Sequence, residues 1–331
     1  MNPNQKISEH DSIAFDLIKA VAIFCVIVAH SVSVTDFSIY ACYVSLLWKI
    51  FAHIGVVIFF IVGGFFYSRK KGDLKPFWKK KLFRLVIPWL FCATLTYLIR
   101  AVVHGASLLD YFKWVFGSWS VYYYIVVYLL FLIIFKLFWQ RDLWLYLFMA
   151  LQVTLLILQV FGISTTIPLP FFTDYLNPLH WIGYFSLGIL IRRYRLDTVL
   201  KKSKTLPVIA AVCVAASLSV AVALGLHTYF HIVTLVYALS SAALIAKGCF
   251  MLSRCNAAKQ IRKIGAASYC IYLLHLQVVN IILKLFPLND FTLTVIPLIC
   301  MAVMIVLVTV GSLVCDKIPH GKKIKALVGL S

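Results

Sequence analysis

The sequence has few acidic residues and no long polar stretch. Its 331 residues include 11 Asp and Glu against 31 Lys and Arg, and Glu9 is the one glutamate. Chemistry that depends on a pair of carboxylates is therefore not expected. The longest polar stretch, roughly residues 68–81, is too short for a soluble domain. We therefore expect residues 1–331 to form a single domain with no separate soluble part.

The nine cysteines lack the spacing of a metal or disulfide framework. No two of them are arranged as C-x-x-C, and most lie inside apolar runs. They are typical of small residues buried in a membrane protein. We expect neither a metal site nor a tightly bound cofactor.

Hydrophobic residues make up 63% of the chain, and the mean hydropathy is +0.97. Apolar runs long enough to cross a bilayer recur from end to end, which predicts an all-α, polytopic integral membrane protein. About ten transmembrane helices are expected, at roughly 13–34, 44–67, 85–103, 120–139, 143–162, 178–192, 205–226, 229–250, 265–286 and 292–315.

Most of the Lys and Arg residues lie in alternate connections between these runs and at the C-terminus. Since basic loops stay in the cytoplasm, this distribution predicts that both ends of the chain are cytoplasmic (N-in, C-in). In a soluble protein a net charge of +20 would suggest nucleic acid as a partner. Here topology, together with contact with anionic membrane lipid or an anionic cofactor, is the better explanation, and no nucleic-acid partner is expected.

The first apolar run, FDLIKAVAIFCVIVAHS at 15–31, carries three ionisable residues, Asp16, Lys19 and His30. Lys19 and His30 are eleven residues apart, so in a helix they lie about 20° apart on one face, separated by about 16 Å along the axis. Asp16 can pair with Lys19. Such groups usually face a bundle interior or an aqueous cavity. The alternative is that Asp16 and Lys19 extend to the cytoplasmic interface while His30 lies among the outer headgroups.

The spacing of a basic residue and a histidine on this helix resembles that of the membrane-bound acyltransferase 3 family. Five further stretches resemble family motifs in the right order. They are GVVIFFIVGGFF (55–66), KKKLFRLVIP (79–88), SWSVYYYIVVYLL (118–130), YFSLGILIRR (184–193) and IGAASYCIYLLHL (264–276).

The chain also departs from the family pattern at several positions. Lys19 stands where the family usually has Arg, which keeps the charge but loses the bidentate guanidinium. Gly63 replaces the usual Ser, Leu276 replaces a common Pro, and the residue immediately before Trp119 is not His.

The resemblance implies an O-acyltransferase of the bacterial inner (plasma) membrane. Members transfer an acyl group, most often acetyl, from cytoplasmic acetyl-CoA to a hydroxyl of a cell-envelope glycan. O-antigen, capsule, exopolysaccharide, peptidoglycan and lipid-linked precursors are the implied acceptors.

We combine the two interpretations in one hypothesis. Lys81 and Arg84, three residues apart, point the same way on a helix and would bind the CoA phosphates together with Lys19. The pantetheine arm would follow the first helix to His30, which acts as general base or as acyl carrier. The basic residues at 69–84 are equally well explained by topology and lipid contact alone.

Four residues are candidates for the acceptor side: His53, Trp119, Tyr123 and His275. His53 is about as well explained by polar packing. For Trp119 and Tyr123 the simpler explanation is an aromatic belt at the outer interface. His275 lies deeper, where an imidazole is costly without a partner. Asp36 is a candidate for a group that orients His30. Lys49 is expected to extend to the outer interface.

Two other classes of function stay open. A transporter or flippase for a glycan or small solute would also use buried charges, although no inverted repeat is visible. A non-catalytic partner in glycan synthesis is compatible with the altered residues Lys19 and Gly63.

Overall fold

The computed structural model is all-helical, and it agrees with the fold class expected from the sequence. The protein is a polytopic membrane protein, and eight helices among the described residues are long and apolar enough to cross a membrane. The structure describes residues 8–32, 39–67, 74–105, 107–166, 172–226, 228–286 and 289–330.

Each of the ten predicted ranges contains a helix. The corresponding elements are α1 (Glu9–Ser31), α2 (Ile39–Phe65), α4 (Ile87–His104), α6 (Tyr123–Phe138), α7 (Asp142–Val160), α8 (Ile182–Tyr194), α10 (Thr205–Ala223), α11 (Ile232–Leu252), α13 (Ser268–Leu285) and α14 (Asp290–Lys317).

Two of these helices are shorter than a full membrane crossing. α6 has 16 residues and α8 has 13, whereas about 20 residues are needed to span the hydrocarbon core. Turns after Gly117, which has φ +87°, delay the start of α6. Pro178 begins a 3₁₀ turn before α8. The ranges 120–139 and 178–192 were therefore too long as predictions of regular helix.

Short helices that the sequence analysis did not define lie at the ends of the bundle. At least three of them are rich in basic residues, namely α3, α12 and α15. The short elements are α3 (Leu74–Lys81), the π-helical turn η1 (Leu82–Val86), α5 (Leu108–Val115), the 3₁₀ turns η2 (Asp174–Leu176) and η3 (Pro178–His180), α9 (Leu196–Lys202), α12 (Asn256–Ala266) and α15 (Gly321–Leu327).

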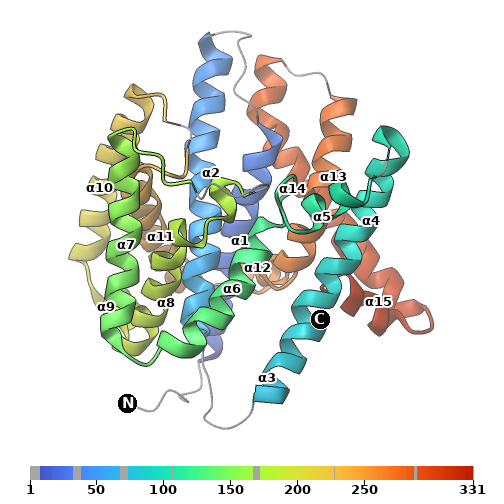
Figure 1. Cartoon of the computed structure of the whole chain (residues 1–331), viewed down its shortest axis with the longest axis horizontal. Helices are drawn as coiled ribbons and strands as arrows, with labels where there is room; N and C mark the ends of the chain where they lie inside the picture. The colour runs from blue at the N-terminus through green and yellow to red at the C-terminus, as the bar shows by residue number, and fades with distance from the viewer. Residues whose placement is uncertain are drawn as a thin grey trace.

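The first two helices form the centre of the bundle (Figure 1). α1 packs against α2, α11, α12, α13 and α14, and most of its residues are buried. α10, in contrast, is largely exposed. Because lipid covers the outside of a membrane bundle, the exposed apolar face of α10 is what a lipid-facing helix requires. Asp16, Lys19 and His30 therefore lie on a helix that is mostly buried.

α2 and α8 touch through glycines. A Cβ atom added to Gly188 would lie 2.0 Å from the Ile61 carbonyl oxygen, and one added to Gly64 would lie 2.0 Å from the Phe185 carbonyl oxygen. Membrane helices approach this closely only where small residues replace side chains. The close approach allows the buried Phe185 ring to pack on Tyr67, Phe131 and Phe135.

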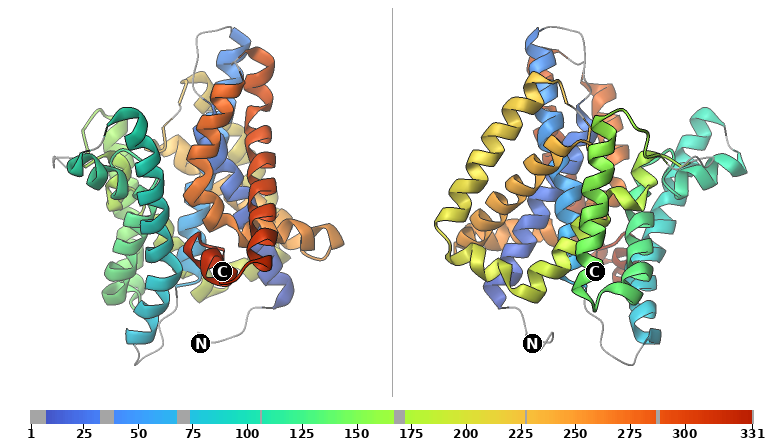
Figure 2. Two further views of the ribbon diagram at one scale, coloured as in Figure 1. Left: turned by 90° about the vertical axis from the view of Figure 1, so that its right-hand side faces the viewer. Right: turned by 60° about the vertical axis from the view of Figure 1, so that its left-hand side comes forward.

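Ion pairs gather at the end of the bundle where α1 begins, which we call the basic end. Lys201 of α9 pairs with Asp11 of α1 at 2.7 Å, and Arg262 of α12 pairs with Asp16 at 2.9 Å. Figure 2 shows α15 toward the same end as the start of α1. The number of crossings and the assignment of this end to the cytoplasm stay predictions.

At the end of the bundle opposite the basic end, hydrogen bonds join the segment after α7 to the 3₁₀ turns before α8. We call this group of contacts the clasp. The buried His180 ring lies 2.9 Å, through Nε2, from the Thr165 hydroxyl, and 3.1 Å, through Nδ1, from the Asp174 carbonyl oxygen. Since a carbonyl only accepts, Nδ1 carries the hydrogen and Nε2 accepts from Thr165. Asn177 donates to the Thr165 carbonyl oxygen at 3.1 Å. The neutral imidazole can make both contacts, and burial of the ring favours that form over the charged one.

The Gly188→Ala substitution is expected to destabilise the protein, because the new methyl group collides with backbone that cannot move aside. Overpacking typically costs about 1–3 kcal/mol. Gly248→Ala on α11 is the matched control, since nothing lies within 4 Å of its added Cβ. Thermal unfolding in detergent should show a lower Tm for Gly188→Ala and an unchanged or higher Tm for Gly248→Ala. Equal Tm values would contradict the close contact.

Acidification is expected to weaken the clasp. Burial lowers the pKa of the His180 imidazole below its usual value of about 6.5, although the Asp174 carbonyl and carboxylate oppose this shift. η3 lies outside the candidate membrane spans. Because the folded pKa is depressed, the contribution to stability is present above about pH 6.5 and is lost as pH falls through the folded pKa.

Tm measured from pH 7.5 to pH 5 should therefore fall more for wild type than for His180→Gln, whose side chain does not titrate. Parallel pH profiles for the two proteins would show that His180 makes no such contribution.

Candidate functional site

Two histidines that are far apart in the sequence lie side by side. His30 is near the end of α1 and His275 is in the middle of α13, and their ring centroids are 5.2 Å apart with a 50° angle between the planes. His275 is fully buried, whereas His30 is partly exposed. The pair therefore joins a fully buried histidine to a less buried one. The sequence analysis had identified both residues but had not predicted their contact.

The tautomer of His275 is set by its own helix. Its Nδ1 lies 2.7 Å from the Tyr272 carbonyl oxygen, so Nδ1 carries the hydrogen and Nε2 has a free lone pair. Nε2 is buried and has no hydrogen-bond partner among the described residues. An unpaired buried acceptor costs about 1–3 kcal/mol. A ligand hydroxyl or the N–H of a neighbouring imidazole would remove that cost.

Tyrosines fix the position of this part of α13. The Tyr122 hydroxyl donates to the Leu273 carbonyl oxygen at 3.1 Å, and the Tyr272 hydroxyl donates to the Val121 carbonyl oxygen. The Tyr124 ring packs edge-on against Tyr272, at 5.6 Å between centroids. α13 is thereby held just before His275, at Tyr272 and Leu273, by the turn that leads into α6 and by the first residues of α6. Tyr124 belongs to this support through its ring contact with Tyr272.

Lys49 of α2 also reaches the end of α1 that carries His30. Its ammonium group donates to the Ala29 carbonyl oxygen at 2.8 Å and is partly buried. Lys49 thus turns toward α1, and its extension to the outer interface stays a prediction. The ammonium satisfies one of the carbonyl groups that the end of a helix leaves without an intrahelical partner, and it places a positive charge one residue from His30.

Asp16 and Lys19 lie at the basic end. The predicted pair is present, with Lys19 Nζ 2.7 Å from Asp16 Oδ1. The other carboxylate oxygen accepts from Arg262 at 2.9 Å, a partner that the sequence did not reveal. Gly265 allows this contact, because a Cβ there would lie 1.7 Å from the Asp16 carbonyl oxygen. The Lys19 and His30 positions are about 16 Å apart along α1, so Asp16 and Lys19 cannot act on the same atoms as His30.

Lys81 and Arg84 have different surroundings. Lys81 ends α3, and its ammonium group lies 3.3 Å from the Tyr128 hydroxyl and 5.4 Å from the centroid of that ring. Arg84 is exposed. The chain between them is π-helical, a widened turn that is often found at functional sites. The expectation of a shared direction assumed a regular α-helix, which this segment is not.

The departure at Gly63 is explained by Tyr128. A Cβ at Gly63 would lie 2.8 Å from the Tyr128 ring. Glycine therefore leaves room for the ring whose hydroxyl meets Lys81. Gly63 and Lys81 belong to one local arrangement on α2, α3 and α6.

The remaining acceptor-side candidates do not join the histidine pair directly. His53 is buried, with its ring 4.4 Å from that of Tyr229. Tyr123 packs on Tyr175 at 5.2 Å between centroids. Trp119 is 48% exposed, and the Lys113 ammonium lies 4.0 Å above its ring. Their roles in acceptor binding stay predictions.

Some predicted residues fall outside the described part of the chain. Asp36, Arg69, Lys70 and Lys71 are among them. Among the residues that the structure describes, no group of three or more His, Cys, Asp or Glu side chains is arranged to hold a metal ion.

A family model for an acyltransferase domain matches residues 12–315, which run from α1 to α14. The chain belongs to the acyltransferase 3 family. No curated protein and no solved structure matched the chain. The matched range includes Lys19, Lys81, Arg84 and both histidines of the pair. Membership in the family supports acyl transfer as the activity, with an acyl donor and an acceptor as the two substrates.

Proposed function

We propose that the protein transfers an acyl group, acetyl in the simplest case, from cytoplasmic acyl-CoA to a hydroxyl group of a cell-envelope glycan. The observation that carries the proposal is the contact between His30 and His275, in which the less buried His30 lies beside a fully buried imidazole of fixed tautomer. An imidazole nitrogen with a free lone pair can take up the proton of a hydroxyl group that attacks the thioester. Family membership supplies the class of reaction.

The donor enters from the basic end in this proposal. Lys19, Lys81 and Arg84 are the cations that would bind the phosphates of CoA. The arm of the donor then follows α1, because the separation of about 16 Å between Lys19 and His30 is of the order of the length of pantetheine. The thioester carbonyl would arrive beside the histidine pair.

Two routes are compatible with this site. In direct transfer, the acceptor hydroxyl attacks the thioester carbonyl, the O–C bond forms and the C–S bond breaks. The hydroxyl proton passes to an imidazole and then to the departing CoA thiolate. In the two-step route an unprotonated nitrogen of His30 attacks the thioester carbonyl, the N–C bond forms, the C–S bond breaks and the CoA thiolate leaves. The acceptor hydroxyl then attacks the acyl group, the O–C bond forms, the N–C bond to His30 breaks, and the hydroxyl proton passes through an imidazole to the thiolate. The Lys49 ammonium lies beside His30 in both cases, where it can stabilise the negative charge of a tetrahedral intermediate.

His30→Ala and His275→Ala are each expected to reduce acyl transfer by at least about 100-fold, the usual contribution of a general base. The assay measures incorporation of radiolabelled acetyl-CoA into envelope glycan by membranes that contain matched amounts of protein. His10→Ala is the control, because His10 is an exposed histidine on the same helix. Normal incorporation by His30→Ala would disprove the catalytic role.

Radiolabelled acetyl-CoA also distinguishes direct transfer from the two-step route. Wild type is mixed with radiolabelled acetyl-CoA without acceptor, quenched and precipitated. Label on the wild-type chain that is missing from His30→Ala indicates an acyl-histidine intermediate, whereas an unlabelled wild type that still transfers to glycan indicates direct attack. If wild type transfers nothing from acetyl-CoA to any envelope preparation, transport becomes the better explanation.

Replacing Lys81 and Arg84 together by Ala is expected to weaken acetyl-CoA binding at least about tenfold. A hydrogen bond to a charged group contributes about 1.5–3 kcal/mol, and about 1.4 kcal/mol corresponds to tenfold in affinity. The matched control is Lys79→Ala with Lys80→Ala, since both of these lysines are exposed on the same segment. Binding to purified protein is measured by calorimetry. An equal loss of acetyl-CoA affinity in the two double variants would show that the effect depends on the total positive charge of the segment and not on Lys81 and Arg84.

A further inference from the structure

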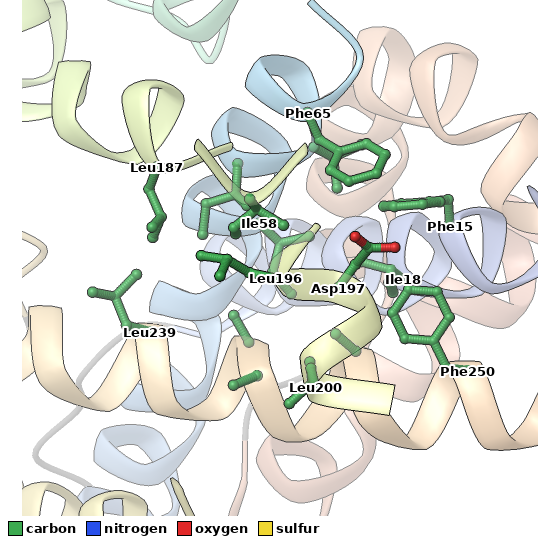
Figure 3. Close-up of a pocket in the computed structure, with 16 residues that line it drawn as sticks. Phe15, Ile18, Ile58, Phe65, Leu187, Leu196, Asp197, Leu200, Leu239 and Phe250 are labelled. Carbon is green, nitrogen blue, oxygen red and sulfur yellow. The ribbon is translucent and has the colours of Figure 1, made fainter. Parts of the chain in front are cut away.

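A cavity of about 290 Å³ lies beside α1 in the half of the bundle nearer the basic end. Its walls come from α1, α2, α8, α9 and α11 (Figure 3). All the residues that line it are apolar except Asp197. The aromatic rings of Phe15, Phe65 and Phe250 lie on one side of it.

The cavity suits an alkyl chain better than water. Apolar cavities stay dry and bind apolar ligands, and a cavity of about 150 Å³ already accepts benzene. A buried water needs two to four polar partners, and this lining offers one carboxylate, which is already 3.2 Å from Lys201. In a membrane protein, the alkyl chains that are always present at high concentration are those of lipids.

α9 forms the wall of the cavity nearest the basic end. Lys201 of α9 is 2.7 Å from Asp11 of α1. Lys247 of α11 donates to the carbonyl oxygens of Leu200, Lys201 and Ser203 at 3.1, 2.6 and 3.1 Å. The short helix is therefore attached to both α1 and α11, so the cavity is a built feature of the fold.

Cations lie over the aromatic rings that line the cavity. The Arg192 guanidinium is 5.3 Å from the centroid of Phe65, and the Lys201 ammonium is 4.3 Å from that of Phe250. Lys201 is balanced by two carboxylates. Arg192 forms no ion pair with the residues that the structure describes, and Lys202 nearby is exposed. An apolar cavity with uncompensated positive charge at its edge matches a chain that ends in an anionic headgroup.

We propose that this cavity binds one acyl chain of an anionic membrane phospholipid, with the headgroup phosphate at Arg192. The acyl chain fills the space between α11 and the α1–α2 pair. It thereby stabilises the position of α1, which carries candidate catalytic residues. The acyl group of the donor is a poorer occupant. Ile18 lines the cavity, and His30 is twelve residues farther along α1, about 18 Å away.

The first test is lipid-dependent stability of the delipidated full chain in detergent. Phosphatidylglycerol should raise the Tm by several degrees, and phosphatidylcholine with the same chains should raise it by less than half as much. Equal stabilisation by the two lipids would overturn the role of the anionic headgroup. Stabilisation by palmitoyl-CoA with none by phosphatidylglycerol would overturn the proposal and assign the cavity to a donor chain.

Substitutions in the cavity test whether the Tm shift caused by phosphatidylglycerol arises there. Ala246→Trp fills it and should abolish the shift caused by phosphatidylglycerol, whereas Met251→Trp, at a position 66% exposed on the same helix, should keep it. Arg192→Gln should remove the preference for phosphatidylglycerol over phosphatidylcholine. If Ala246→Trp does not fold, Ala243→Leu makes a smaller filling substitution with the same expectation.

Native mass spectrometry provides an independent readout. One phosphatidylglycerol should remain on wild type and on Met251→Trp, and none on the filled variant. A full shift or a retained lipid in the filled variant would place the lipid elsewhere and overturn the proposal. None of these readouts depends on acyl transfer, so the lipid proposal can be correct or wrong independently of the proposed function.

Discussion

The enclosure of α1 by other helices is the constraint on which the rest of the structure depends. An ionisable side chain at membrane depth is stable only where protein groups replace the lost water. α1 carries three such side chains, and the bundle places a partner near each of them. Asp16 lies between Lys19 and Arg262, and His30 lies against His275. The helices around α1 are thus the source of the environment in which any chemistry takes place.

This arrangement divides the protein into two ends with different physical character. The basic end is rich in cations and short amphipathic helices, and it suits an anionic substrate or lipid. The opposite end is aromatic and holds the histidine pair with its tyrosine supports. α1 is the element that extends from one end to the other. A reaction that joins a donor from one side of a membrane to an acceptor on the other needs a connection of this kind.

Much of the fold could be predicted from the sequence, and the reason is the bilayer. Runs of about 20 apolar residues have only one way to satisfy their backbone polar groups in lipid, which is the helix. All ten predicted ranges therefore contain helices. The errors occurred at α6 and α8, where the turn after Gly117 and the 3₁₀ turn at Pro178 shorten the helix. The short helices at the bundle ends were not predicted, because a search for long apolar runs does not detect short helices.

The sequence by itself determined that Asp16 and Lys19 pair and that Lys19 and His30 share a face, because helix geometry fixes the relative positions of residues on one helix. It could not determine that His275, Arg262 and Lys49 meet α1. Contacts between helices depend on close packing at small residues such as Gly188 and Gly265, and these contacts have no local pattern in the chain. The widened turn between Lys81 and Arg84, and the cavity under α9, were likewise decided by the tertiary structure, because both arise where several helices must fit together at once.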